Sequence, residues 1–172
     1  NKNLLKFIFN IDKDLRIIGI TFQGRVFQID WQTCINNDQK LDSKFIGNID
    51  PNEIINFHTI EKGKHNYLCT LNSDGRFKKV FFDDDMIKSN RSFSITKLKN
   101  NVKILDSFIF KEEELLIILT SLGRIFKFYL SNKYIVPTTK QSQGLVLTKL
   151  LPKEKIVSCC TSTSKEKLYL IS

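Results

Sequence analysis

The sequence predicts an all-β fold built from repeats of about 50 residues. The first observation is a short phrase that occurs three times, around Gly24, Gly75 and Gly123, which lie 51 and then 48 residues apart. The second is composition, because isoleucine and phenylalanine are abundant while alanine is absent. β-Branched and aromatic residues suit strands, whereas alanine is the strongest helix former. The third is that no helical periodicity longer than two turns is present.

Each repeated phrase is expected to form the turn of a β-hairpin. An apolar run precedes every one of the three glycines and an alternating run follows it. Glycine supplies the positive φ that such turns require. The expected strand pairs are residues 15–20 with 25–29, 67–71 with 76–82, and 115–119 with 124–130.

A second paired motif follows each hairpin after a polar connection. Its expected strands are residues 44–49 with 54–57, 93–98 with 102–105, and 144–150 with 155–158. Each unit then supplies about four strands, which is the content of one propeller blade. We therefore expect roughly three four-stranded blades, with residues 167–172 resembling the start of another hairpin. Propeller rings typically hold ~4–8 blades, so further repeats or self-association of two chains would close such a ring.

The charge balance points to a polyanionic partner. The formal net charge is +9 and the sequence pI is about 9.4. An excess of this size favours nucleic acid, although a basic surface can also serve solubility. No apolar run reaches the ~18 residues of a membrane span, so we expect no membrane partner. The chain begins at Asn1 without an initiator methionine or signal-peptide pattern, and we interpret it as part of a longer protein.

The sequence offers no candidate catalytic or metal-binding group. No paired carboxylates, Ser-His-Asp arrangement or glycine-rich phosphate loop can be identified, so we expect no catalytic residue and no cofactor. We also expect no metal site, because the cysteines and histidines do not have zinc-ligand spacing. These residues are Cys34, Cys69, Cys159, Cys160, His58 and His65.

Two stretches carry a resemblance to a known family. Residues 116–127 resemble the first half of the repeat in the C-terminal DNA-binding domain of the DNA gyrase A protein, and residues 143–157 resemble its second half. The corresponding protein of topoisomerase IV has the same repeat. The resemblance covers nearly all of residues 1–172 and implies one partial or short β-pinwheel domain, a propeller-like ring whose strands cross between neighbouring blades.

The resemblance also implies what the domain does. It would bind and bend duplex DNA along a basic outer rim, as a non-catalytic accessory domain of an ATP-dependent type IIA topoisomerase. Its partners would be double-stranded DNA, the rest of the A-type protein of that enzyme, and the separate ATPase protein. The compartment would be bacterial cytoplasm, at the nucleoid, or a plastid-type organelle.

Ten basic residues are candidates for the DNA contacts. The family typically has basic residues after the turn glycine, and matched positions of the second motif and nearby segments are basic as well. Since no base-reading element is present, we expect salt-sensitive binding that tolerates any DNA sequence. The candidates are Arg25, Arg76, Lys78, Lys79, Arg91, Lys97, Arg124, Lys127, Lys140 and Lys149.

The sequence departs from the family in one feature, and its residues also allow one alternative function. The Gln-Arg-Arg-Gly-Gly-Lys-Gly box of the gyrase A protein is absent, so the resemblance does not imply tight wrapping and does not separate gyrase from topoisomerase IV. The alternative is a protein-interaction β-propeller of another repeat family (RCC1-like). Basic residues gathered on the blade rim would favour DNA, and an even scatter would favour a protein partner.

Overall fold

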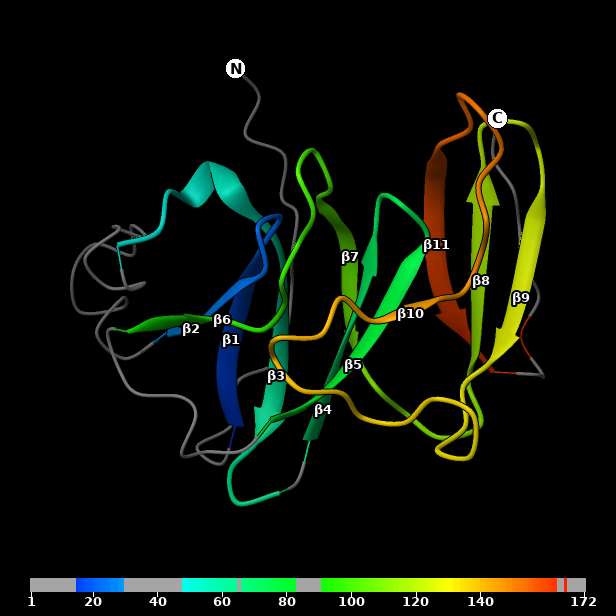
Figure 1. Cartoon of the computed structure of the whole chain (residues 1–172). Coiled ribbons are helices and arrows are strands. Elements are labelled where there is room, and N and C mark those ends of the chain that lie inside the picture. The colour runs from blue at the N-terminus through cyan, green and yellow to red at the C-terminus, as the bar shows by residue number, and fades with distance from the viewer. Residues whose placement is uncertain (1–14, 30–47, 65, 83–90, 164–165, 167–172) are drawn as a thin grey trace.

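The computed structural model describes residues 15–29, 48–64, 66–82, 91–163 and 166. These residues form β-strands and one short 3-10 helix, η2 (Pro51–Glu53), with no α-helix among them (Figure 1). None of the described residues belongs to a helix that could cross a membrane. The strands are β1 (Leu15–Thr21), β2 (Arg25–Ile29), β3 (Ile54–Glu61), β4 (Asn66–Asn72), β5 (Arg76–Phe82), β6 (Ser92–Ser94), β7 (Ile104–Ile109), β8 (Leu115–Thr120), β9 (Ile125–Tyr129), β10 (Leu145–Val146) and β11 (Ile156–Ser162).

The strands assemble into antiparallel sheets of order β3-β1-β2-β6, β10-β5-β4-β7 and β11-β8-β9. The three predicted hairpins are present as β1/β2, β4/β5 and β8/β9. Their turns contain Gly24, Gly75 and Gly123 with φ of 82°, 81° and 73°. Residues that carry a Cβ are strained at such φ angles, which explains why all three turns have glycine at this position. The all-β prediction is confirmed.

The fourth strand of each four-stranded sheet comes from the following repeat. Strand β6 of the second repeat pairs with β2 of the first, and β10 of the third repeat pairs with β5 of the second. The predicted pairing of the two strands of the second motif with each other is therefore wrong, because β6 and β7 pair with β2 and β4, while the crossing between blades that the resemblance implies is present. Three strands stay with their repeat and one crosses to the preceding sheet. The equivalent residues 44–47 of the first repeat lie outside the described residues.

The three sheets lie side by side, and a buried apolar layer fills the space between neighbours (Figure 1). Ile18 and Val26 of the first sheet share one cluster with Leu68 and Val80 of the second. A second cluster joins the second and third sheets, with Leu71, Phe77, Leu116 and Ile118 among its members. Burial of these side chains provides the main stabilising contribution, because each removes apolar area from water.

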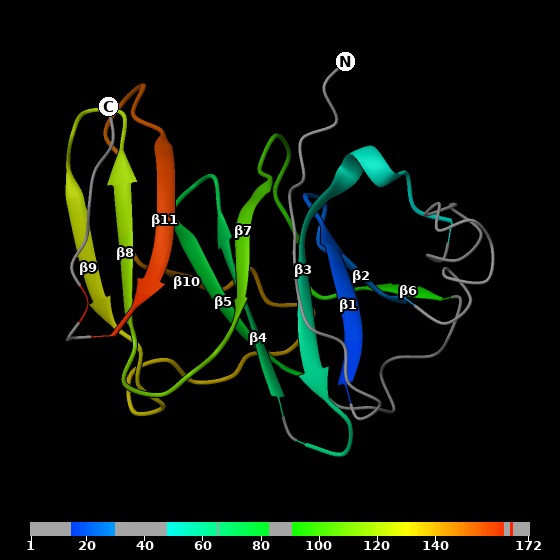
Figure 2. The ribbon, with the colours of Figure 1, turned by 180° about the vertical axis from the view of Figure 1, so that it is seen from behind.

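Polar side chains connect the sheets along β3, β7 and β11, which lie on one face of the molecule (Figure 2). His58 Nε2 lies 2.8 Å from Ser107 Oγ, and Asn56 Nδ2 donates to Asp106 Oδ1 at 3.0 Å. Cys159 Sγ donates to the other oxygen of Asp106 at 3.3 Å. Burial lowers the pKa of His58 to about 4, partly opposed by the charge of Asp106. The crossing strands β6 and β10 lie on the opposite face (Figures 1 and 2).

Candidate nucleic-acid interface

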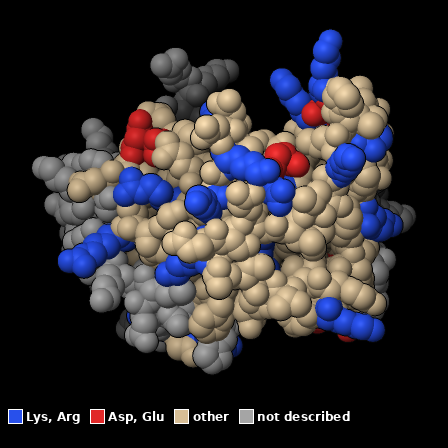
Figure 3. All heavy atoms as spheres, in the orientation of Figure 1, with Lys and Arg blue, Asp and Glu red and all other residues tan. Residues whose placement is uncertain are grey.

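The basic residues gather on the two segments that cross between blades. We call residues 91–103 and 131–155 the crossing segments, and the face that they cover the crossing face. They contain nine lysines and arginines but a single acidic residue, Glu154, which is 6% exposed and paired with Arg124. Blue side chains accordingly predominate over red in Figure 3. The nine cations are Arg91, Lys97, Lys99, Lys103, Lys133, Lys140, Lys149, Lys153 and Lys155.

Repeated backbone contacts hold two of these cations, Lys103 and Lys155, at matching places in successive blades. Ser73 N donates to Lys103 O, and Ser121 N donates to Lys155 O, both at 2.8 Å. The end of each crossing segment is therefore fixed beside the hairpin turn of its own repeat. Asn101 and Lys153 also share a left-handed φ, of 63° and 65°, one blade apart. The crossing face thus presents exposed positive charge that recurs from blade to blade.

The three turn arginines are half-buried and bonded within the protein. Arg25 Nη2 donates to Ser92 Oγ, and Arg76 Nη1 donates to Gly144 O at 3.2 Å. Arg124 instead bonds Glu154, and it also donates to Lys149 O at 3.2 Å. The hydrogen bond from Arg124 is the main cause that lowers the pKa of Glu154 to about 2.

Lys78 and Lys79 are not on the surface, which corrects their prediction as rim residues. Each is only 1% exposed. Lys78 Nζ donates to Lys140 O at 2.9 Å and to Ser142 O at 2.6 Å. Burial lowers its pKa to about 8. Lys78 therefore holds the second crossing segment in place through the backbone carbonyl groups of Lys140 and Ser142.

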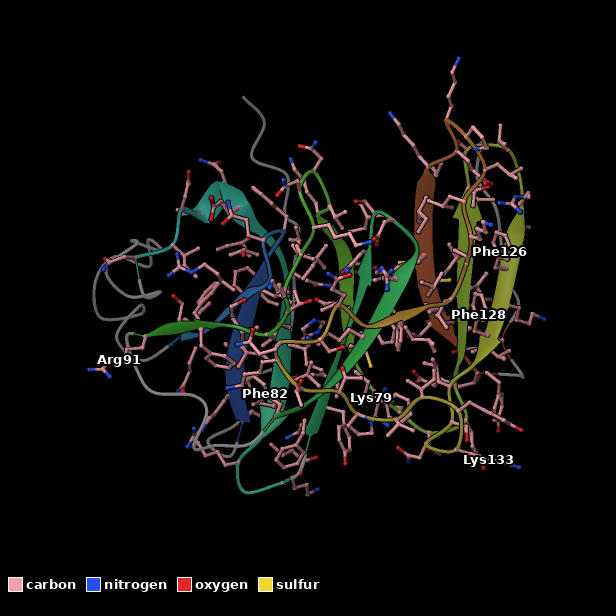
Figure 4. All side chains as sticks on the ribbon, in the orientation of Figure 1. Lys79, Phe82, Arg91, Phe126, Phe128 and Lys133 are labelled. Carbon is pink, nitrogen blue, oxygen red and sulfur yellow. The ribbon has the colours of Figure 1, made fainter. Side chains whose placement is uncertain are left out.

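Lys79 is enclosed in a different way, and Figure 4 shows it inside the molecule. Its Nζ lies 3.4 Å from the ring centroid of Phe110 and 4.4 Å from that of Tyr67, and it donates to Asn132 Oδ1. Burial lowers its pKa from the ordinary value. The aromatic faces and the amide oxygen together compensate the buried cation. Both lysines are buried because the second crossing segment folds over β5.

The other predicted residues keep their charge at or near the surface. Arg91, Lys97, Lys127 and Lys149 are exposed. Lys140 is half-buried, with Nζ 4.6 Å from the ring centroid of Phe93, so it links the two crossing segments. In Figure 4, Arg91 and Lys133 point outward at opposite ends of the molecule.

Sequence reasoning missed five exposed cations of the crossing segments. Lys103 and Lys155 directly precede the strands that begin at Ile104 and Ile156, so a full alignment of the second motifs would have identified this pair. The others have no such repeated signal. The missed residues are Lys99, Lys103, Lys133, Lys153 and Lys155.

Repeated hairpin sheets that receive a strand from the next repeat, as the first two described sheets do here, are the arrangement of a β-pinwheel. Solved structures with this fold include a topoisomerase IV C-terminal domain, at 15% identity and TM-score 0.61 over 91% of this chain. A DNA gyrase A C-terminal domain matches at 18% identity and TM-score 0.65 over 92% of the chain. The E. coli ParC C-terminal domain matches at 15% identity and TM-score 0.62 over 87% of it.

These likenesses confirm the resemblance at the level of the fold. The chain spans 64%, 55% and 63% of the length of these three domains, respectively. No family model and no curated protein matches the sequence.

Proposed function

We propose that the chain binds duplex DNA along its crossing face and bends the duplex that follows it. The observation that carries this proposal is the segregation of charge. Nine cations lie on the two crossing segments, and their single carboxylate is buried in an ion pair with Arg124. Segregation of this kind supports a nucleic-acid partner over the protein-interaction alternative.

The chemistry of such binding is electrostatic. Duplex DNA carries closely spaced phosphates, and each contacting lysine or arginine releases condensed counterions. The side chains of Lys97 and Lys149, one blade apart, can each meet a phosphate while the backbone stays fixed. Contacts to phosphates carry no sequence information, so binding tolerates any sequence. A duplex that follows the face pays ~1–6 kcal/mol for a 40–90° bend, which added phosphate contacts offset.

The solved structures with this fold supply the wider context. They are C-terminal domains of DNA gyrase A and topoisomerase IV. We therefore propose that this chain is an accessory domain in the A-type protein of a type IIA topoisomerase, which works with an ATPase protein in bacterial cytoplasm or a plastid-type organelle. Residues of the crossing face would guide the DNA, and the chemistry would belong to other parts of that enzyme.

The test is a titration of a fluorescent duplex of arbitrary sequence, at several salt concentrations, with the chain and two double variants. Lys97→Gln/Lys149→Gln removes two charges from the crossing face. Lys62→Gln/Lys64→Gln removes two exposed charges from the β3–β4 turn and is the matched control.

We expect the crossing-face variant to bind more weakly, with a salt slope reduced by ~1.8, since each lost phosphate contact changes it by ~0.9. The control variant should bind as the unchanged chain does. Equal weakening by both variants would mean that DNA affinity depends only on the total charge of the chain, and this would contradict binding along the crossing face. No binding of the unchanged chain at low salt would overturn the proposal.

A further inference from the structure

The two crossing segments differ in the apolar side chains that they expose. Residues 131–155 carry five large apolar side chains that are open to solvent, whereas residues 91–103 carry none. Single exposed apolar residues are ordinary on a protein surface, but here they are interspersed with the lysines of the crossing face. The five are Tyr134, Val136, Leu145, Val146 and Leu151.

A comparison of the two blades shows that one of these residues replaces a polar one. Ser94 lies opposite Arg25 of the first turn, and Val146 lies opposite Arg76 of the second turn. The residue after each of them donates its N–H to the turn glycine, at 3.0 and 3.1 Å. The two segments therefore have the same register. At one exposed place the first blade has a serine and the second has a valine that is 49% exposed.

A second replacement follows on the other side of Lys149. Residues 97–103 match residues 149–155, because both stretches begin after the same seated threonine and end at a lysine bonded to its own turn. Leu151 then stands at the place of Lys99. Both residues are exposed, Leu151 at 49%. The second crossing segment thus has an apolar pair, Val146 and Leu151, where the first has only polar groups.

The backbone beneath this pair is fixed. Val146 belongs to β10 and is paired with β5. Leu151 N donates to Glu154 Oε2 at 2.8 Å, and Glu154 N donates to Leu151 O at 3.0 Å. Neither side chain packs into a core cluster of the described residues. The pair is therefore already in position for a ligand, so binding costs little conformational entropy in the protein.

Apolar side chains on a face that binds a duplex cannot contact phosphates favourably. They need an apolar part of the nucleic acid, and the carbon atoms of the sugars supply one. DNA and RNA differ at this place, since the minor groove of an RNA duplex displays 2′-hydroxyl groups. A hydroxyl buried against valine or leucine would lose its hydrogen bonds to water without replacement, which is unfavourable.

We propose that Val146 and Leu151 pack against deoxyribose groups and make the crossing face prefer duplex DNA over duplex RNA. The inference rests on the proposed function, because it adds a contact to the same duplex. The lysines bind phosphates, which both nucleic acids have, whereas the apolar pair distinguishes the sugars. Sugar contacts carry no information about the bases, so binding still tolerates any sequence.

The experiment measures the anisotropy of fluorescent DNA and RNA duplexes of the same sequence, titrated with the chain at several salt concentrations. The test variant is Val146→Ser/Leu151→Gln, which changes no charge and places at residue 146 the serine of the first blade. Leu105→Gln/Val157→Ser is the matched control. It removes the same two residue types, 40% and 63% exposed, from β7 and β11 on the opposite face (Figure 2).

We expect the unchanged chain to bind DNA more tightly than RNA. The test variant should bind DNA about tenfold more weakly, because two half-exposed aliphatic side chains no longer become buried. Its affinity for RNA should not change, and its salt slope should equal that of the unchanged chain, since no cation is removed. The control variant should bind both duplexes as the unchanged chain does.

Two kinds of failure can be told apart. If the unchanged chain binds DNA without preferring it, or the test variant keeps the preference, the inference is overturned while the proposed function stands. Equal weakening toward DNA and RNA, or by test and control variants alike, would also overturn the inference. No binding of the unchanged chain to either duplex would overturn the proposed function and this inference with it.

Discussion

The second and third hairpins carry the same turn phrase but have different surroundings. Gly75 lies under the backbone of a crossing segment and Phe77 is 1% exposed, while no atom of the described residues lies within 4 Å of a Cβ built at Gly123, and Ile125 is 51% exposed. Local sequence makes both hairpins, yet burial of the outer strand depends on later segments, namely the neighbouring sheet and the crossing strand that pairs with it. The same substitution should therefore have a large effect in one hairpin and a small one in the other.

Truncation of the outer-strand side chain should give the largest contrast. Phe77→Ala is expected to lower the free energy of unfolding by about 3–5 kcal/mol, because it opens a cavity in the second core cluster. Ile125→Ala should cost about 1 kcal/mol, since half of that side chain is already in water. Urea unfolding of the two variants measures both losses. Similar losses would show that the edge of β9 is covered in solution.

Alanine at the turn glycines should give the next contrast. Gly75→Ala combines a left-handed φ with overlap onto the carbonyl of Thr148, and should cost about 3 kcal/mol. Gly123→Ala carries the φ penalty alone, about 1 kcal/mol. Thermal or urea unfolding of this pair isolates the contact with the crossing segment. A Gly123→Ala loss as large as that of Gly75→Ala would show that the Gly123 turn is covered as well.

The third repeat should make an acid-sensitive contribution to stability through the buried carboxylate of Glu154, whereas the Arg76–Asp74 ion pair of the second repeat is more exposed at its carboxylate. The pKa of Glu154 is about 2, against 4.5 for an ordinary glutamate, mainly because Arg124 bonds it. Its stabilising contribution is complete above pH 4.5 and is lost as the pH falls toward 2. Unfolding midpoints of the unchanged chain and Glu154→Gln should therefore converge in acid. Glu53→Gln, the same change at the first turn, is the control, and a constant gap for Glu154→Gln would refute this role.

Lysine labelling should show the smallest difference between the second and third hairpins, but it reports directly on which lysine side chain is covered. Lys79 and Lys127 stand four residues after their turn glycines, and only Lys127 is exposed. An acylating reagent at neutral pH, read by peptide mass spectrometry, should modify Lys127 quickly and Lys79 slowly. Comparable rates would mean that the second crossing segment opens readily.

The residue pattern alone was sufficient for the hairpins but not for the exchange of strands, which only the family resemblance implied. The glycine turns of Gly24, Gly75 and Gly123 are local features, fixed by φ and by the apolar runs beside them, and all three were predicted. Strand β10 is only Leu145–Val146, so its pairing to β5 has almost no local signal. Its position follows from contacts between segments far apart in sequence.

The same limit explains which candidate site residues were misread. Lys78 and Lys79 follow Phe77 in a strand, and nothing in that order shows that a later segment covers them. Lys97 and Lys149 were predicted from their matched positions, and both are exposed on the crossing face. Repetition thus identified Lys97 and Lys149 as surface residues, but the equally repeated turn arginines are half-buried and bonded within the protein, and burial by a distant segment could not be predicted from it.

Strand exchange also determines when each sheet can be completed while the chain is being synthesised. Strand β5 ends at Phe82, but its partner β10 ends at Val146, 64 residues later. A nascent second sheet must therefore remain a three-stranded structure with an uncovered edge until most of the third repeat has left the ribosome. Since chains grow at ~5–20 residues per second, that edge is open for several seconds. Each four-stranded sheet is completed only when the following repeat has been synthesised, so the most recently made sheet of the growing chain lacks its fourth strand.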